Sequence, residues 1–158
     1  TDLVLEMATI VTDAQLNIIA EGPCLTIHQT EARMALMDDW NTKHHGESGL
    51  TARVLASTTT EAMAEAETMK FLADYVGPRD SPLCGNSIGQ DRRFIDRHMP
   101  KLGEFFHYRN LDVSSIKVLV MRWKPEIMDL VVKGGKHRAL DDIRESIDEL
   151  KVYRANVF

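Results

Sequence analysis

The sequence predicts an α/β domain with a mixed sheet flanked by helices. Apolar runs rich in β-branched residues come first, at residues 3–12 and 16–20. Stretches with apolar residues at helical spacing follow, and short strand-like runs at 82–84 and 107–113 alternate with them, which is the order that builds a layered α/β fold. The 158 residues suffice for one sizeable core, so we predict a single domain over residues 1–158.

The first half is predicted to contain a hairpin and three helices. Asp13-Ala14-Gln15 interrupts the apolar run, so residues 3–20 are expected to fold back on themselves. Thr58 and Glu61 have the spacing of a capping box, and Gly77-Pro78 is expected to end the helix that they begin. The remaining predicted elements of this half are an extended segment at 24–28 and helices at 31–40 and 50–56.

The second half is predicted to alternate strands with helices. Pro100 is expected to end a helix, because proline cannot continue one, and Ser114 is a good N-cap. The predicted elements are a strand at 82–84, a helix at 88–99, a strand at 107–113, a helix at 115–123 and a terminal helix with an apolar stripe at Ala139, Ile143, Ile147 and Leu150.

Composition limits the possible partners. Lys and Arg total 19 against 24 Asp and Glu, and this net charge of −5 argues against long double-stranded nucleic acid as a ligand. No apolar run approaches the roughly 20 residues that span a bilayer, so no membrane partner is expected. Cys24 and Cys84 form no C-x-x-C pair, and reduced thiols in the cytoplasm are the simplest account of them.

Asp91 occupies an unusual position for an acid. It lies three residues before Phe94 and four before Ile95, so its side chain shares the apolar face of its helix. A carboxylate in such a place needs a cation or a metal ion as its partner. A salt bridge to Arg92 or Arg93, or a slightly rotated helix, is the alternative.

A second candidate group lies at the start of the terminal helix. Asp142 flanks the apolar stripe, although acids near a helix N-terminus are favoured by the macrodipole whatever their function. The Gly134-Gly135 turn lets His137 lean toward Asp142. A histidine beside a metal-binding carboxylate suits the activation of water as a general base, whereas a surface or capping histidine is the alternative.

Two stretches together resemble the oligoribonuclease family, bacterial 3′→5′ exoribonucleases that degrade very short RNAs. The resemblance implies an RNase H-like fold of the exonuclease type, two divalent cations (Mg²⁺ or Mn²⁺) and a homodimer. The stretches are Gly-Asn-Ser-Ile-Gly-Gln-Asp-Arg-Arg-Phe at 85–94 and His-Arg-Ala-Leu-Asp-Asp-Ile-Arg-Glu-Ser at 137–146, and the likeness extends over essentially the whole chain through residues 37–41, 107–109 and 111–114.

The resemblance implies a role for each matching residue. Asp91 and Asp142 would bind metal, and His137 would take the proton from the attacking water. The implied reaction is hydrolysis of short oligoribonucleotides, especially dinucleotides, from the 3′ end to nucleoside 5′-monophosphates. The implied substrate-binding residues are Trp40 and His45 for the bases, Ser87, Arg109 and Ser114 for the 5′ phosphate, and Tyr108, which would reach the site of the partner subunit. A core position is the alternative for Trp40.

The sequence departs from the family at its beginning. The family's first motif, an Asp-x-Glu pair on an opening strand, is not found. Leu5-Glu6-Met7 echoes the middle of that motif, but Val4 stands where the aspartate should be, so we interpret Glu6 as a residue of the second strand. We therefore expect the first strand of the fold, which lies in the middle of the sheet, to be missing from this sequence and the natural protein to begin earlier.

Two other functions remain open. A dinucleotide-binding module that keeps the phosphate site and has lost its metal centre would explain the missing acidic pair. A homodimer that retains only the fold is the third possibility.

Overall fold

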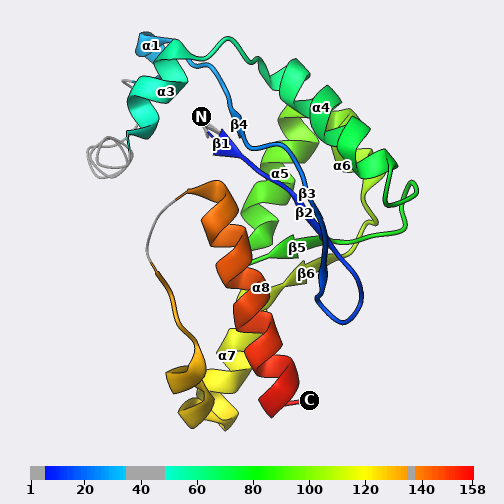
Figure 1. Cartoon of the computed structure of the whole chain (residues 1–158), viewed down its shortest axis with the longest axis vertical. Helices are drawn as coiled ribbons and strands as arrows, with labels where there is room; N and C mark the ends of the chain where they lie inside the picture. Colours follow the sequence, from blue (N-terminus) through cyan, green and yellow to red (C-terminus); the bar gives the residue numbers. More distant parts are fainter. Residues whose placement is uncertain (1–5, 35–48, 135–137) are drawn as a thin grey trace.

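Short strands come first and mostly helices follow in the structure, a computed structural model that describes residues 6–34, 49–134 and 138–158 (Figure 1). The strands are β1 (Glu6–Met7), β2 (Ile10–Thr12), β3 (Ile18–Glu21), β4 (Leu25–Thr26), β5 (Leu83–Gly85) and β6 (Asn110–Asp112). The helices are α1 (Glu31–Met34), α3 (Leu50–Ala56), α4 (Glu61–Ala73), α5 (Ile88–His98), α6 (Pro100–Phe105), α7 (Val113–Trp123), the 3₁₀ helix η1 (Pro125–Leu130) and α8 (Ala139–Asn156).

The described strands form three separate pairs. β1 pairs with β4 and β2 with β3, both antiparallel, whereas β5 and β6 are parallel. The predicted hairpin is confirmed by β2 and β3, and the Asp13 carboxylate closes its turn by accepting the Gln15 and Asn17 amides at 2.9 Å each. Both strand directions predicted for a mixed sheet are present, but no strand among the described residues joins the pairs into one sheet.

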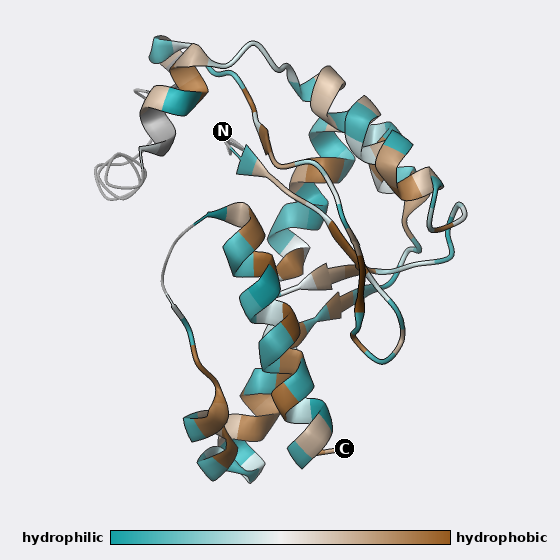
Figure 2. Cartoon of the chain, in the orientation of Figure 1, coloured by the Kyte–Doolittle hydropathy of each residue, from teal (hydrophilic) through white to brown (hydrophobic). Residues whose placement is uncertain are grey.

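Buried side chains gather in two hydrophobic clusters. Figure 2 shows apolar colour on the strands that the helices surround and on α7 and η1. The larger cluster joins β2 and β4 to α4, α5 and α6, and consists of Val11, Ile27, Ala64, Leu72, Phe94, Ile95, Met99, Leu102 and Phe106. The smaller cluster joins α7 to α8 through Val113, Val120 and Tyr153, with Ile127 and Met128 of η1 packed against it. Phe94 and Ile95 of α5 therefore pack in one cluster, and Tyr153 of α8 packs in the other.

Hydrogen bonds in the structure place the N-caps of two helices at other residues than predicted. Asp112 caps α7 in place of Ser114, because its Oδ1 accepts the Ser114 amide hydrogen at 2.9 Å. Thr60 caps α4 in place of Thr58, because its Oγ1 accepts the Met63 amide at 3.1 Å. In both cases the capping oxygen belongs to the residue directly before the first helical turn.

Other predicted boundaries were also wrong. Pro100 ends α5 as predicted, but it also begins α6, since its missing N–H costs nothing at the first helical position. Helix α4 stops at Ala73, well before Gly77-Pro78, and the strand predicted at 107–113 is limited to Asn110–Asp112. The sequence interpretation contained neither α6 nor η1.

The terminal helix α8 is confirmed, but its most buried side chains differ from the predicted stripe. Glu149 and Tyr153 are buried, whereas Ala139, Ile143, Ile147 and Leu150 are half-buried. A buried glutamate on this helix requires donors around it. None of the described helices combines the length and the apolarity needed to cross a membrane.

We expect Thr60→Ala to lower the free energy of unfolding by about 1 kcal/mol, because it removes the acceptor of the Met63 amide hydrogen. Thr58→Ala is the matched control, since Thr58 is exposed and lies outside the helix. Its unfolding free energy should stay within about 0.5 kcal/mol of the wild type. Urea unfolding measures both, and equal destabilisation would contradict the cap assigned to Thr60.

Candidate active site

The start of α5 is held in an uncommon backbone conformation. Ser87 precedes the helix with φ at 52°, in the left-handed region that non-glycine residues rarely adopt. Its amide donates to Asp112 Oδ1 at 2.9 Å and to Ser114 Oγ at 3.1 Å, which fixes this conformation against α7. These bonds determine the direction in which the first turn of α5, and with it Asp91, projects.

Asp91 lies in this first turn without a partner. No hydrogen bond or ion pair joins its carboxylate to any of the described residues, so the predicted alternative of a salt bridge to Arg92 or Arg93 is wrong within them. Arg92 instead binds Asp96 at 3.3 Å. Asp91 is exposed, so the prediction that it lies on the buried face of its helix is wrong, but desolvation by neighbouring atoms still raises its pKa above the ordinary value. Such an acid gains most from a cation.

Asp142 lies in the first turn of α8 and is exposed. Its amide donates to the Arg138 carbonyl at 2.9 Å, and its own carbonyl accepts the Ser146 hydroxyl at 3.1 Å. The neighbouring Asp141 forms an ion pair with Arg144 at 3.8 Å. Asp141 is half-buried and Asp142 is exposed, so Asp142 is the acid that lies further out.

A buried glutamate from β1 holds the N-terminus of α8. Glu6 Oε1 accepts the Ala139 amide at 2.8 Å and Arg138 Nε at 3.2 Å, and Oε2 accepts Arg53 Nη2 at 3.3 Å. The side chain is only 5% exposed. Burial raises the pKa of Glu6, but these donors outweigh that effect and leave the pKa below its ordinary value of 4.5. This carboxylate is therefore occupied by contacts at the helix terminus.

A second buried glutamate connects α8 to the loop before α5. Glu149, with a side chain 1% exposed, binds Lys133 Nζ at 2.6 Å and accepts from the Tyr153 hydroxyl at 2.5 Å and from Asn86 Nδ2 at 3.4 Å. Burial raises the pKa of Glu149, but the donors from Lys133, Tyr153 and Asn86 more than compensate and lower it overall. The sequence interpretation missed this group, although the spacing of seven residues between Asp142 and Glu149 places both on one helix face.

Two of the predicted phosphate-binding residues are brought together. The hydroxyl oxygens of Ser87 and Ser114 lie 3.4 Å apart. Arg109 lies next along the chain to Tyr108, with its guanidinium 5.2 Å from the centre of that ring. Its side chain makes no hydrogen bond or ion pair with the described residues, so its donors are available to a ligand.

Three predicted site residues, His137, Trp40 and His45, lie outside the described residues. Within the described ranges, no group of three or more His, Cys, Asp or Glu side chains could hold a metal ion. Asp91 nevertheless fits such a role, because carboxylate oxygens are the ligands that Mg²⁺ prefers and this carboxylate lacks any other described partner.

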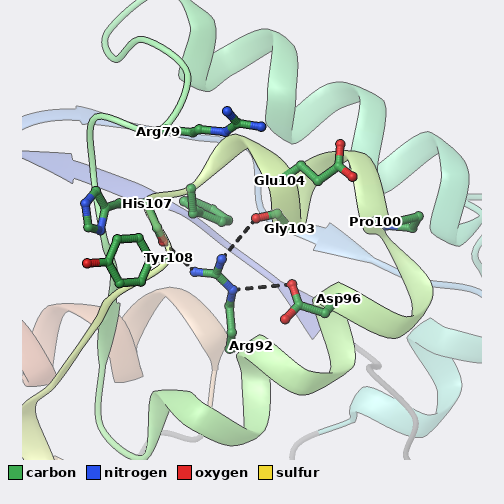
Figure 3. Close-up of a pocket in the computed structure, with 9 residues that line it drawn as sticks. Arg79, Arg92, Asp96, Pro100, Gly103, Glu104, His107 and Tyr108 are labelled. Carbon is green, nitrogen blue, oxygen red and sulfur yellow. Dashed lines mark hydrogen bonds and ion pairs between the residues drawn. The ribbon is translucent and has the colours of Figure 1, made fainter.

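An open pocket lies on another side of α5 and is separate from these acids (Figure 3). Arg92 dominates one wall, where it also donates to the Gly103 and His107 carbonyls at 3.1 and 2.9 Å. Protein acceptors therefore occupy most of the N–H donors of the Arg92 guanidinium. Of the predicted site residues that the structure describes, only Tyr108 lines this pocket, so we do not assign the chemistry to it.

Comparison with known proteins agrees with the resemblance. A family model described as an exonuclease matches residues 1–150. The oligoribonuclease of Shewanella loihica is 60% identical over 157 residues, which are 99% of this chain and 87% of the relative. The oligoribonuclease of Aeromonas hydrophila is also 60% identical over 157 residues, with the same coverage, and that of Marinobacter nauticus is 57% identical over 155 residues, 98% of this chain and 86% of the relative.

We expect Glu6→Gln to reduce the unfolding free energy by about 1–3 kcal/mol near neutral pH, because it weakens the bonds that hold the start of α8. The folded pKa of Glu6 is lowered, so its contribution is complete above the ordinary value of 4.5 and is lost as the pH falls through the folded value. The difference between wild type and variant should therefore shrink on acidification.

The matched control for this experiment is Glu21→Gln. Glu21 also forms an ion pair with α8, at 2.6 Å from Arg144, but its side chain is 40% exposed. Exposed pairs contribute little to stability, so this variant should change the unfolding free energy only slightly. Urea unfolding at several pH values measures both, and a pH-independent effect of Glu6→Gln would contradict the role of its charge.

Proposed function

Because the chain belongs to the oligoribonuclease family of exonucleases, we propose that this nuclease hydrolyses short oligoribonucleotides, especially dinucleotides, from the 3′ end to nucleoside 5′-monophosphates. The observation that carries the proposal is the start of α5, where Asp91, whose carboxylate has no partner among the described residues, follows Ser87 by four residues, and the Ser87 hydroxyl lies beside that of Ser114 of α7. A metal ligand and a phosphate donor thus arise from one short segment.

Divalent metal ions are general cofactors of exonucleases of this family. We propose two ions, Mg²⁺ or Mn²⁺, with Asp91 and Asp142 among their ligands. Bound divalent cations lower the pKa of an attacking water and stabilise the leaving 3′ oxygen. The raised pKa and missing partner of Asp91 support its assignment, because a metal ion would supply the charge that the described residues do not.

His137 is proposed as the general base. It lies outside the described residues, but the chain is anchored on both sides of it: Lys133 binds Glu149, and Arg138 binds Glu6. An imidazole with an ordinary pKa of about 6.5 accepts a proton near neutral pH.

The phosphate site explains the proposed preference for very short substrates. The hydroxyls of Ser87 and Ser114, and the Arg109 guanidinium, which has no hydrogen bond or ion pair within the described part of the chain, are the kinds of donor that a terminal 5′ phosphate requires. Trp40 and His45 are proposed to hold the bases. A short substrate held by its terminal phosphate needs no extended basic groove, which agrees with the net charge of −5.

We propose a homodimer that acts in the cytoplasm. The ring of Tyr108 is 74% exposed and stacks on His107, so it is held outward where a second subunit could receive it. Cys24 and Cys84 are free thiols, which suits a reducing compartment. Further exposed apolar side chains on α7 and η1 and just after them could be covered by the partner; they are Val118, Leu119, Met121, Trp123, Leu130 and Val132.

A dinucleotide-binding module without catalysis is the second candidate. It is favoured by one observation: the Ser87–Ser114 pair is assembled, whereas no group of three metal-binding side chains occurs among the described residues. Calorimetry combined with product analysis separates the two candidates, since tight binding of a dinucleotide without any cleavage fits only the module.

We expect Asp91→Asn and Asp142→Asn each to reduce turnover of a 5′-phosphorylated diribonucleotide in Mn²⁺ by at least about 100-fold, because residues that merely orient metal ligands are already worth about 10–100-fold. Asp141→Asn is the matched control, since this neighbouring acid forms an ion pair with Arg144. It should keep near-wild-type turnover. Equal turnover of the three variants would contradict the assignment.

We expect Ser87→Ala to remove much of the preference for a 5′-phosphorylated dinucleotide over one with a free 5′ hydroxyl. One hydrogen bond to a charged phosphate contributes about 1.5–3 kcal/mol, so the ratio of kcat/KM values should fall about tenfold or more. Ser115→Ala is the control, because Ser115 is exposed on α7 directly after Ser114. An unchanged ratio would exclude Ser87 from the phosphate site.

A further inference from the structure

The side-chain amide of Asn86 contacts two helices at once. Its Nδ2 donates to Ser114 Oγ of α7 at 3.2 Å and to Glu149 Oε1 of α8 at 3.4 Å. Its Oδ1 accepts the hydroxyl of Ser146, also on α8, at 2.5 Å. Asn86 itself lies between β5 and α5, so the amide connects the start of α5 to the middle of α8.

Both proposed metal ligands lie close to this connection along the chain. Asp91 is five residues after Asn86, in the first turn of α5. Asp142 is four residues before Ser146, which is one helical turn, or about 5.4 Å along the axis of α8. The hydrogen bond between Asn86 and Ser146 therefore lies about one turn from each acid.

Among the described residues, only the Asn86 amide bonds the start of α5 directly to α8, although the Ser87 amide also bonds it to α7. Phe94 and Ile95 of α5 belong to the larger hydrophobic cluster, and Tyr153 of α8 to the smaller one. Apolar contacts are non-directional and permit sliding, whereas an amide with three bonded partners fixes both position and orientation. Glu149 strengthens the connection made by Asn86, because the side chain of Glu149 is 1% exposed and is itself bound by Lys133.

We propose that Asn86 is a positioning residue, which holds the start of α5 against α8 and so sets the separation of Asp91 and Asp142. The inference rests on the proposed metal role of these acids. Asn86 does not act on the substrate or the metal. Its effect passes through the placement of two helices, as with the groups that orient the ligands of known metal sites.

The test uses the full chain and two variants of different severity. Asn86→Ala removes all three bonds, and Ser146→Ala removes the hydroxyl that donates to Asn86 Oδ1, together with its contact to the Asp142 carbonyl. The control is Asn156→Ala, another asparagine truncation, because the amide of Asn156 bonds only to the Val152 carbonyl of its own helix. Thermal unfolding confirms that each variant is folded at the assay temperature.

The first readout is the affinity for Mn²⁺ alone, measured by calorimetry without substrate. We expect the Kd to rise about tenfold or more in Asn86→Ala and in Ser146→Ala, and to stay unchanged in Asn156→Ala. The double variant should bind Mn²⁺ no more weakly than Asn86→Ala, because both changes break the same link. Affinity in Ser146→Ala equal to that of the control would overturn the proposal, as would an absence of Mn²⁺ binding by the wild type.

The second readout is dinucleotide turnover. Ser146→Ala should lower kcat and leave KM nearly unchanged, since its hydroxyl contacts the link and not the phosphate site, and excess Mn²⁺ should restore part of the loss. A fall in kcat that excess Mn²⁺ does not relieve would overturn the proposal. If the wild type binds Mn²⁺ but cleaves nothing, the proposed function fails, while the Mn²⁺ affinities still decide the positioning role.

Discussion

The arrangement of this molecule depends on a glutamate that is buried and satisfied. A carboxylate removed from water costs several kcal/mol unless donors surround it. Glu149 meets that requirement with an ammonium, a phenol and an amide from three different parts of the chain. Because the requirement is strict, the charge of Glu149 is accommodated only after three parts of the chain have come together. These are the segment before α8, the loop before α5 and the interior face of α8.

Glu6 and Asp91 show two further outcomes of the same physical constraint. Glu6 is satisfied at the N-terminus of α8, where the backbone amide and two arginines meet it, and its pKa falls. Asp91 has no described donor, and its pKa rises. The direction of the pKa shift thus distinguishes Glu6, which has a structural role, from Asp91, which is available to a ligand. Shifted pKa values mark functional acids in other proteins as well.

The sequence alone predicted the class of the fold, the hairpin, the main helices and the resemblance, because each depends on local periodicity or on a long contiguous motif. It failed where the decision was a matter of tertiary bonding. Nothing in the local sequence distinguishes Thr58 from Thr60 as the N-cap of α4, so Thr58 was predicted where Thr60 is the cap. Glu149 was passed over because a glutamate inside a helix is ordinarily solvated. The resemblance implied that Ser87 and Ser114 share a site, whereas local sequence does not, because their pairing depends on the parallel register of β5 and β6.

The division of the apolar interior into two clusters has a consequence for how this protein would lose its activity. Phe94 and Ile95 of α5 and Tyr153 of α8 pack in different clusters, so warming or mild denaturant can let one helix shift against the other while both stay folded. A shift of about an ångström is invisible to circular dichroism, yet is large for the proposed metal ligands Asp91 and Asp142, because distances in metal sites hold to about 0.2 Å. Activity would then be lost before any helical signal. An activity assay would therefore detect a shift between α5 and α8 earlier than circular dichroism would.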